Sequence, residues 1–240
     1  MNFPTFLQGL QIKRLCFSIT LSLACLLAAC TPAVSARDVP DAITMQAALP
    51  VETWELFASD VAGFELSAPP TWLVISADEP EFAEFAFGYG MNLEAAGVDM
   101  MLYGVDMSDA AELSTSVNLL RMEMPVDLPL SVMLRVNAKV LESMPGLEGE
   151  ISSTEFDSTF GEVGELSYRA RIDAPYDNTV YALRQFFFVK EGFAYVFTFA
   201  TYEDFAPAYA PVVNTMLNTL SVQTPALELP MVSAGEPAAL

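Results

Sequence analysis

The stretch VYALRQFFFVKEGFAYVFTFAT, Val180 to Thr201, decides the fold because it holds the clearest strand–turn–strand pattern in the chain. Two runs rich in β-branched and aromatic residues, Val180 to Val189 and Phe193 to Thr201, flank the turn Lys190-Glu191-Gly192. Gly192 can adopt the positive φ angle that such a turn requires. The pattern therefore predicts a β-hairpin.

The second strand of this hairpin is apolar on both faces. Large and small side chains alternate along it, with Phe193, Tyr195, Phe197 and Phe199 on one face and Ala194, Val196, Thr198 and Ala200 on the other. A strand without charge on either face needs cover on two sides, and small residues allow a helix to approach closely. We expect the aromatic stripe to be core rather than a ligand site.

Two predicted helices can provide this cover. The first begins after Asp127, which can cap it, carries Pro129 in its first turn, and ends at Pro145-Gly146. The last runs over roughly Ala208 to Leu220 with apolar residues at helical spacing, and tolerates Pro211 only near its first turn. The sequence therefore places helices against a sheet.

The other strand candidates surround the hairpin in the chain. Prolines or glycines interrupt or flank several of them, as strand ends require. They comprise two runs around Pro69-Pro70 within Phe64 to Ser76, and Phe82 to Tyr89, Val98 to Met107, Ser116 to Met124, Glu155 to Phe160 and Glu165 to Ile172.

This order of elements resembles the PsbP-like and DcrB-like superfamily. The resemblance is carried by an F-x-L-x-x-P-x-x-W opening from Phe64 to Trp72, a strand that ends in Pro125 before a helix, the hairpin, and a closing helix that runs into TLSV. It implies an α+β fold, an α/β/α sandwich with a mainly antiparallel central sheet covered by helices, over about Val51 to Val222. It also implies a non-enzymatic envelope protein that binds or helps assemble a partner. No site residue can be transferred.

The N-terminus indicates export and lipid attachment. Lys13 and Arg14 precede an apolar stretch, Leu15 to Ala29, which is typical of a secretory signal peptide and is shorter and more polar than a membrane span. The segment Leu27-Ala28-Ala29-Cys30 resembles the lipobox of bacterial lipoproteins, in which the cysteine carries the lipid, with acyl chains such as palmitate. We expect Cys30 to be lipidated and to start the mature chain, on the extracytoplasmic face of a cell membrane.

These signals divide the chain into four parts. Residues 1–29 are the expected signal peptide, residues 30–50 an Ala/Pro-rich tether, residues 51–224 one PsbP-like domain, and residues 225–240 a disordered Pro/Ala-rich tail. Cleavage leaves Cys30 as the single cysteine, so the mature chain can form no internal disulfide.

The composition excludes several function classes. The 240 residues include 31 Asp and Glu against 10 Lys and Arg, a net charge of -21, which repels nucleic-acid phosphates. The absence of histidine removes the Ser-His and Cys-His dyads and the most common general base near neutral pH. No cofactor motif is present, so we expect no cofactor.

Carboxylates are the one reactive group in good supply. Asp78, Glu79, Glu81 and Glu84 form the densest cluster, which a solvated loop explains most simply and which leaves calcium binding open. A carboxylate-based hydrolase of the envelope is the alternative function. The favoured reading is a lipid-anchored, non-enzymatic binding or assembly module with a protein partner in the envelope.

Overall fold

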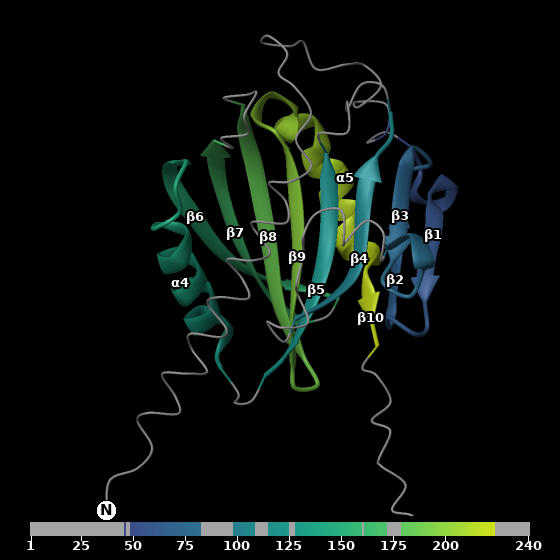
Figure 1. Cartoon of the computed structure of the whole chain (residues 1–240), viewed down its shortest axis with the longest axis horizontal. Helices are drawn as coiled ribbons and strands as arrows, with labels where there is room; N and C mark the ends of the chain where they lie inside the picture. The colour runs from purple at the N-terminus through teal and green to yellow at the C-terminus, as the bar shows by residue number, and fades with distance from the viewer. Residues whose placement is uncertain are drawn as a thin grey trace, which may run out of the picture.

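A computed structural model of the chain describes residues 46, 49–82, 98–108, 115–124, 128–159, 161–171 and 179–223. Within these residues the chain is mostly antiparallel β-structure with two longer helices (Figure 1). The elements are η1 (Val51–Thr53), β1 (Glu55–Ser59), β2 (Phe64–Ala68), β3 (Trp72–Ser76), β4 (Asp99–Asp106), β5 (Ser116–Glu123), α4 (Leu130–Leu141), β6 (Leu147–Ser158), β7 (Gly161–Arg171), β8 (Val180–Lys190), β9 (Phe193–Tyr202), η3 (Glu203–Phe205), α5 (Ala206–Thr219) and β10 (Ser221–Val222).

Seven strands form the large sheet in the order β3-β4-β5-β9-β8-β7-β6, and β1-β2-β10 form a smaller one. The predicted hairpin is confirmed as β8 and β9, which lie at the middle of the large sheet. Lys190 pairs with Phe193, so the turn itself has two residues, Glu191 and Gly192, with φ angles of 51° and 82°. Positive φ at both positions gives the turn the twist that suits two long antiparallel strands.

Each face of the large sheet is covered by a different helix, and we name the faces after them. On the α4 face, a Cβ atom at Gly164 of β7 would lie 2.5 Å from Cδ1 of Leu134, so the missing side chain lets α4 pack directly on the strand. On the α5 face, the rings of Tyr209 and Phe199 lie 6.0 Å apart. In Figure 1, α5 runs behind the strands while α4 lies at the β6–β7 end.

The predicted sheet is confirmed as mainly antiparallel with helical cover, but a simple α/β/α sandwich is not confirmed. The small sheet was not expected, and it packs with α5: Oγ1 of Thr219 accepts a hydrogen bond from the backbone N–H of Ser67 in β2 (3.2 Å). The strand β10 that completes it has only two residues, too few for a readable period.

The helix boundaries differ from the prediction in two places. Pro129 is the N-cap of α4 rather than part of its first turn, and no side chain caps the helix; Asp127 lies outside the described residues. The turn η3 leads directly into α5, so the helix begins at Ala206 and Pro211 lies beyond its first turn. The predicted strand Phe82 to Tyr89 is wrong at Phe82, which is helical, and residues 83–89 lie outside the described part.

Candidate functional site

Three uncharged polar side chains form a continuous row on the α4 face, in the middle of the sheet. Gln185 of β8 pairs with Thr198 of β9, which pairs with Asn118 of β5. Directly opposite residues on one face have Cβ atoms about 4.5–5.5 Å apart. Gln185 and Thr198 have no exposed surface and Asn118 has 1%. We call these three residues the polar row.

Most polar side-chain atoms of the polar row have no hydrogen-bond partner in the described chain. Both side-chain atoms of Gln185, Oγ1 of Thr198 and Oδ1 of Asn118 are buried without a partner there. The same holds for the hydroxyl of Tyr168, on the same face of β7, and for Oδ1 of Asn137 on α4. Buried polar groups in proteins are nearly always bonded, so a cluster of unpaired ones requires an explanation.

The surroundings of the polar row are neutral. Within the described spans of β5, β7, β8 and β9, the one charged residue on the α4 face is Glu162, which is exposed at the start of β7, beyond Gly164. Burial raises the pKa of Tyr168, so its hydroxyl keeps its proton and remains a donor. The flanking residues along the three strands are apolar or small, namely Leu183, Phe187, Val196, Ala200, Ser116 and Leu120.

The helix α4 is attached to the sheet by apolar packing alone. Its buried side is Leu130, Met133, Leu134, Asn137 and Leu141. The Nδ2 of Asn137 donates to the carbonyl of Met133 in the same helix (2.9 Å). Among the residues that the structure describes, no side-chain hydrogen bond or ion pair joins α4 to a strand.

The α5 face contains a second buried polar group, and this one is fully bonded. Oδ2 of Asp106, at the end of β4, accepts hydrogen bonds from the Tyr209 hydroxyl (2.5 Å) and from Nε2 of Gln46 (2.9 Å). Its Oδ1 accepts the backbone N–H of Ser108 (2.9 Å). Trp72 donates to Oε1 of Gln46 (3.4 Å). We call Asp106, Tyr209, Gln46 and Trp72 the Asp106 network.

The Asp106 network explains several properties of this region. Burial and the Asp106 charge raise the pKa of Tyr209, which therefore stays a hydrogen-bond donor. Gln46 belongs to the stretch expected to be a tether, yet it is 4% exposed and bonded to the core. The network thus holds α5 and the chain before β1 against the end of β4.

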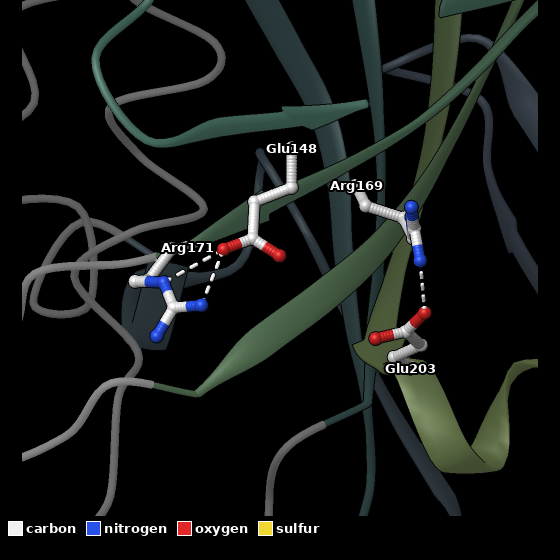
Figure 2. Close-up of polar contacts among 4 residues, drawn as sticks. All are labelled: Glu148, Arg169, Arg171 and Glu203. Atoms are coloured by element: carbon white, nitrogen blue, oxygen red, sulfur yellow. Dashed lines mark hydrogen bonds and ion pairs between the residues drawn. The ribbon is translucent and has the colours of Figure 1, made fainter. Parts of the chain in front are cut away.

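Arginines on the α5 face form ion pairs. Figure 2 shows two of them: Arg171 of β7 bonds Glu148 of β6, and NH1 of Arg169 lies 2.6 Å from Oε1 of Glu203. Both pairs are partly exposed, so each contributes little to stability. Both carboxylates of Figure 2 are paired with a guanidinium rather than with a second carboxylate.

A third pair on this face is better buried. Nε of Arg184 donates to Oε1 of Glu165 (2.7 Å), NH2 donates to Oε2 (3.2 Å), and NH2 also reaches Oδ1 of Asn214 on α5 (3.0 Å). Burial alone would raise the pKa of Glu165, but hydrogen bonds from Arg184 and Ser167 and the Arg184 charge outweigh it and hold the pKa below its ordinary value.

The acidic cluster predicted as a loop is described in part. Asp78, Glu79 and Glu81 are exposed, and Glu84 lies outside the described residues. Asp78 accepts hydrogen bonds from the hydroxyls of Ser59 (2.7 Å) and Ser76, and these bonds lower the pKa of Asp78. The side chain of Glu79 accepts a hydrogen bond from the backbone N–H of Ser76 (2.9 Å). Across the described part of the chain, no three acidic or cysteine side chains converge as a metal site would require.

The remaining predicted site residue is Cys30, which lies outside the described residues. In the part that the structure covers, no helix has the length and apolar character needed to cross a bilayer.

Sequence reasoning missed the polar row. The alternation along the strand places Thr198 on its small face, which we expect a helix to cover, and no sequence motif for a functional site includes Gln185 or Asn118. A signal was present, because each amide interrupts a strand whose other residues on that face are mostly apolar. What no sequence pattern supplied was the register that places the three residues side by side.

No protein-family model and no curated protein matches the chain. Solved structures that are similar to it include a cyanobacterial PsbP from Synechocystis sp., with 16% identity over 73% of this chain and 95% of that one and a TM-score of 0.46. LpqN of Mycobacterium tuberculosis, described as involved in cell envelope biogenesis, has 11% identity over 71% and 91%, with a TM-score of 0.45. The yeast Ran-binding protein Mog1p has 9% identity over 70% and 95%, with a TM-score of 0.45.

The first of these structures belongs to the family that the sequence resembles. Identities this low and TM-scores this modest assign neither a family nor a function to the present chain, so its function has to be argued from its own residues.

Proposed function

We propose that this protein is a membrane-tethered extracytoplasmic lipoprotein whose acidic domain is a non-enzymatic binding or assembly module. The lipobox-like segment that ends at Cys30, after a basic pair and an apolar stretch, supports the location. Two or more acyl chains hold a protein stably at a bilayer, whereas one does so only marginally. Because the chain has a net charge of -21, its acidic domain gains nothing from anionic head groups, so the lipid alone would provide attachment.

The polar row is the observation that carries the binding role. A folded chain that keeps several unpaired polar groups in the middle of its sheet loses stability, and such a loss is typical of sites that serve a function. The proposal includes a protein partner in the envelope. It includes no nucleic acid, because the negative charge of the chain repels phosphate groups.

The hydrolase alternative finds less support in the described residues. Asp106 is the fully buried carboxylate among them, and both of its oxygens accept hydrogen bonds from groups that hold the fold together. A glycosidase-type mechanism needs two carboxyl groups facing one substrate. The acids of Figure 2 are instead each paired with an arginine.

The lipid attachment is tested by replacing single cysteines in the full chain. With Cys30→Ala we expect loss of fatty-acid labelling and either release from membranes or failure of processing, because the thiol that accepts the lipid is gone. Cys25→Ala, within the same leader, is the matched control and should change neither. Labelling by an alkyne-tagged fatty acid, membrane fractionation and the mass of the mature chain measure the result. Unchanged labelling and processing in Cys30→Ala would overturn the proposal.

A further inference from the structure

We propose that the polar row and the buried side of α4 form a binding site for a small neutral molecule that carries hydroxyl and amide groups, of the kind that an N-acetylated sugar presents. The inference rests on the binding role proposed above but not on the lipid at Cys30. The evidence is the juxtaposition of Gln185, Thr198 and Asn118 in one register line, with unpaired atoms on the same face of the sheet as α4, which packs on β6, β7 and β8 and so reaches the strand of Gln185.

The donors and acceptors of the polar row define the ligand's chemistry. The amide of Gln185 offers both donors and an acceptor, the Thr198 hydroxyl can do either, and Oδ1 of Asn118 accepts. A ligand that satisfies all three must itself carry donors and acceptors close together, as hydroxyl and amide groups do. A ligand that carries only donors or only acceptors would leave part of the polar row unpaired.

The absence of charge next to the polar row disfavours ions. Placing a charged group against an uncharged buried surface costs far more than placing a neutral one, unless a counter-charge is present. No charged residue adjoins the polar row along β5, β8 or β9, and Glu162, the charged residue on this face of β7, is exposed at the start of that strand. The ring of Tyr168 and the side chains of Val196 and Leu183 can contact the apolar faces of a sugar ring.

The route to the polar row follows from the way α4 is attached. Apolar packing of Leu134 against Gly164 holds the helix, with no side-chain hydrogen bond to a strand among the described residues and no side-chain cap at Pro129. Apolar contacts can slide without breaking directional bonds, so α4 is the element that can move to admit a ligand. Asn137, on the buried side of α4, has a further carbonyl that is unpaired at Oδ1.

The test uses the full chain in detergent micelles, with ¹⁵N-labelled glutamine and asparagine side chains followed by NMR. The probes are the neutral N-acetylglucosamine, the cationic glucosamine and the anionic glucuronate. All three are water-soluble sugars that do not enter micelles, so the detergent does not remove them from solution. We expect the side-chain amide signals of Gln185 and Asn118 to shift saturably with N-acetylglucosamine, and the two charged probes to bind at least about tenfold more weakly.

Two variants keep the test specific. We define the row variant as Gln185→Leu combined with Thr198→Val, which removes polar groups of the polar row and keeps side chains of similar size. Its affinity for N-acetylglucosamine should fall at least about tenfold, measured on the side-chain amide signal of Asn118. Asn214→Leu removes an amide from the opposite face and should leave binding unchanged. No saturable shift, equal shifts with all three probes, or binding retained by the folded row variant would each overturn the inference. Lipid labelling of Cys30 is measured in the same preparations. A labelled chain that does not bind the sugar would overturn this inference and leave the proposed lipid anchor intact.

Discussion

Two groups of buried polar residues, the Asp106 network and the polar row, lie on opposite faces of one sheet and differ in the satisfaction of their hydrogen bonds. In the Asp106 network, both carboxylate oxygens are occupied by donors from α5, from the chain before β1 and from the backbone. In the polar row, the amide of Gln185 has no partner within the described residues. Burial is equally complete in both, so burial alone does not distinguish a structural polar group from a candidate binding one.

The two helices differ in the same way. The helix α5 is joined to its surroundings by directional bonds from Tyr209, Asn214 and Thr219, whereas the described residues of α4 contribute apolar packing to the sheet. A helix held by directional bonds is fixed in register, and a helix held by apolar contacts is freer to shift. The comparison therefore supports a structural role for the α5 face and is the basis of the binding site proposed on the α4 face.

The largest expected effect is on the Asp106 network. Tyr209→Phe removes one donor from a buried carboxylate while it preserves the ring packing against Phe199, and a hydrogen bond to a charged group contributes about 1.5–3 kcal/mol. We expect the free energy of unfolding to fall by about that amount in urea denaturation. A variant as stable as the native chain would show that the network does not hold the fold.

The row variant should change stability in the opposite direction. Replacing unpaired buried polar groups with apolar ones of similar shape removes a desolvation cost, so Gln185→Leu with Thr198→Val should raise the free energy of unfolding by about 1–2 kcal/mol. The same urea experiment measures it. Destabilisation would mean that the polar row is bonded in solution and belongs with the Asp106 network.

The smallest expected effect concerns pH. Because the folded state holds the pKa of Glu165 below its ordinary value, the pair with Arg184 contributes stability above that ordinary value and loses it as the pH falls through the folded-state pKa. Arg184→Met should therefore flatten the acid side of the stability curve between about pH 5 and pH 3. Arg169→Met, which breaks an exposed pair, is the control and should leave the curve unchanged.

Much of the fold could be predicted from local pattern. The hairpin of β8 and β9, the strands on either side of Pro69-Pro70, β4 and β5 follow from alternation and turn residues, and the structure confirms them. The small sheet could not be predicted, because β10 has two residues and its pairing with β2 joins parts of the chain far apart in sequence.

The candidate site was harder to predict for a physical reason. Glutamine, threonine and asparagine on three strands become one site only through the pairing of Gln185 with Thr198 and of Thr198 with Asn118. Register is a property of the assembled sheet, and a shift of one residue would send each side chain to the other face. The carboxylates drew attention because they are numerous, whereas the polar row is uncharged and sparse.

The most direct measurement is the titration of N-acetylglucosamine on the native chain and the row variant side by side, together with the stability of each. The account predicts a native chain whose Gln185 amide responds to the sugar until saturation, and a row variant that unfolds at higher urea and no longer responds. A native chain that ignores the sugar, or a row variant that is less stable than the native chain, would contradict it.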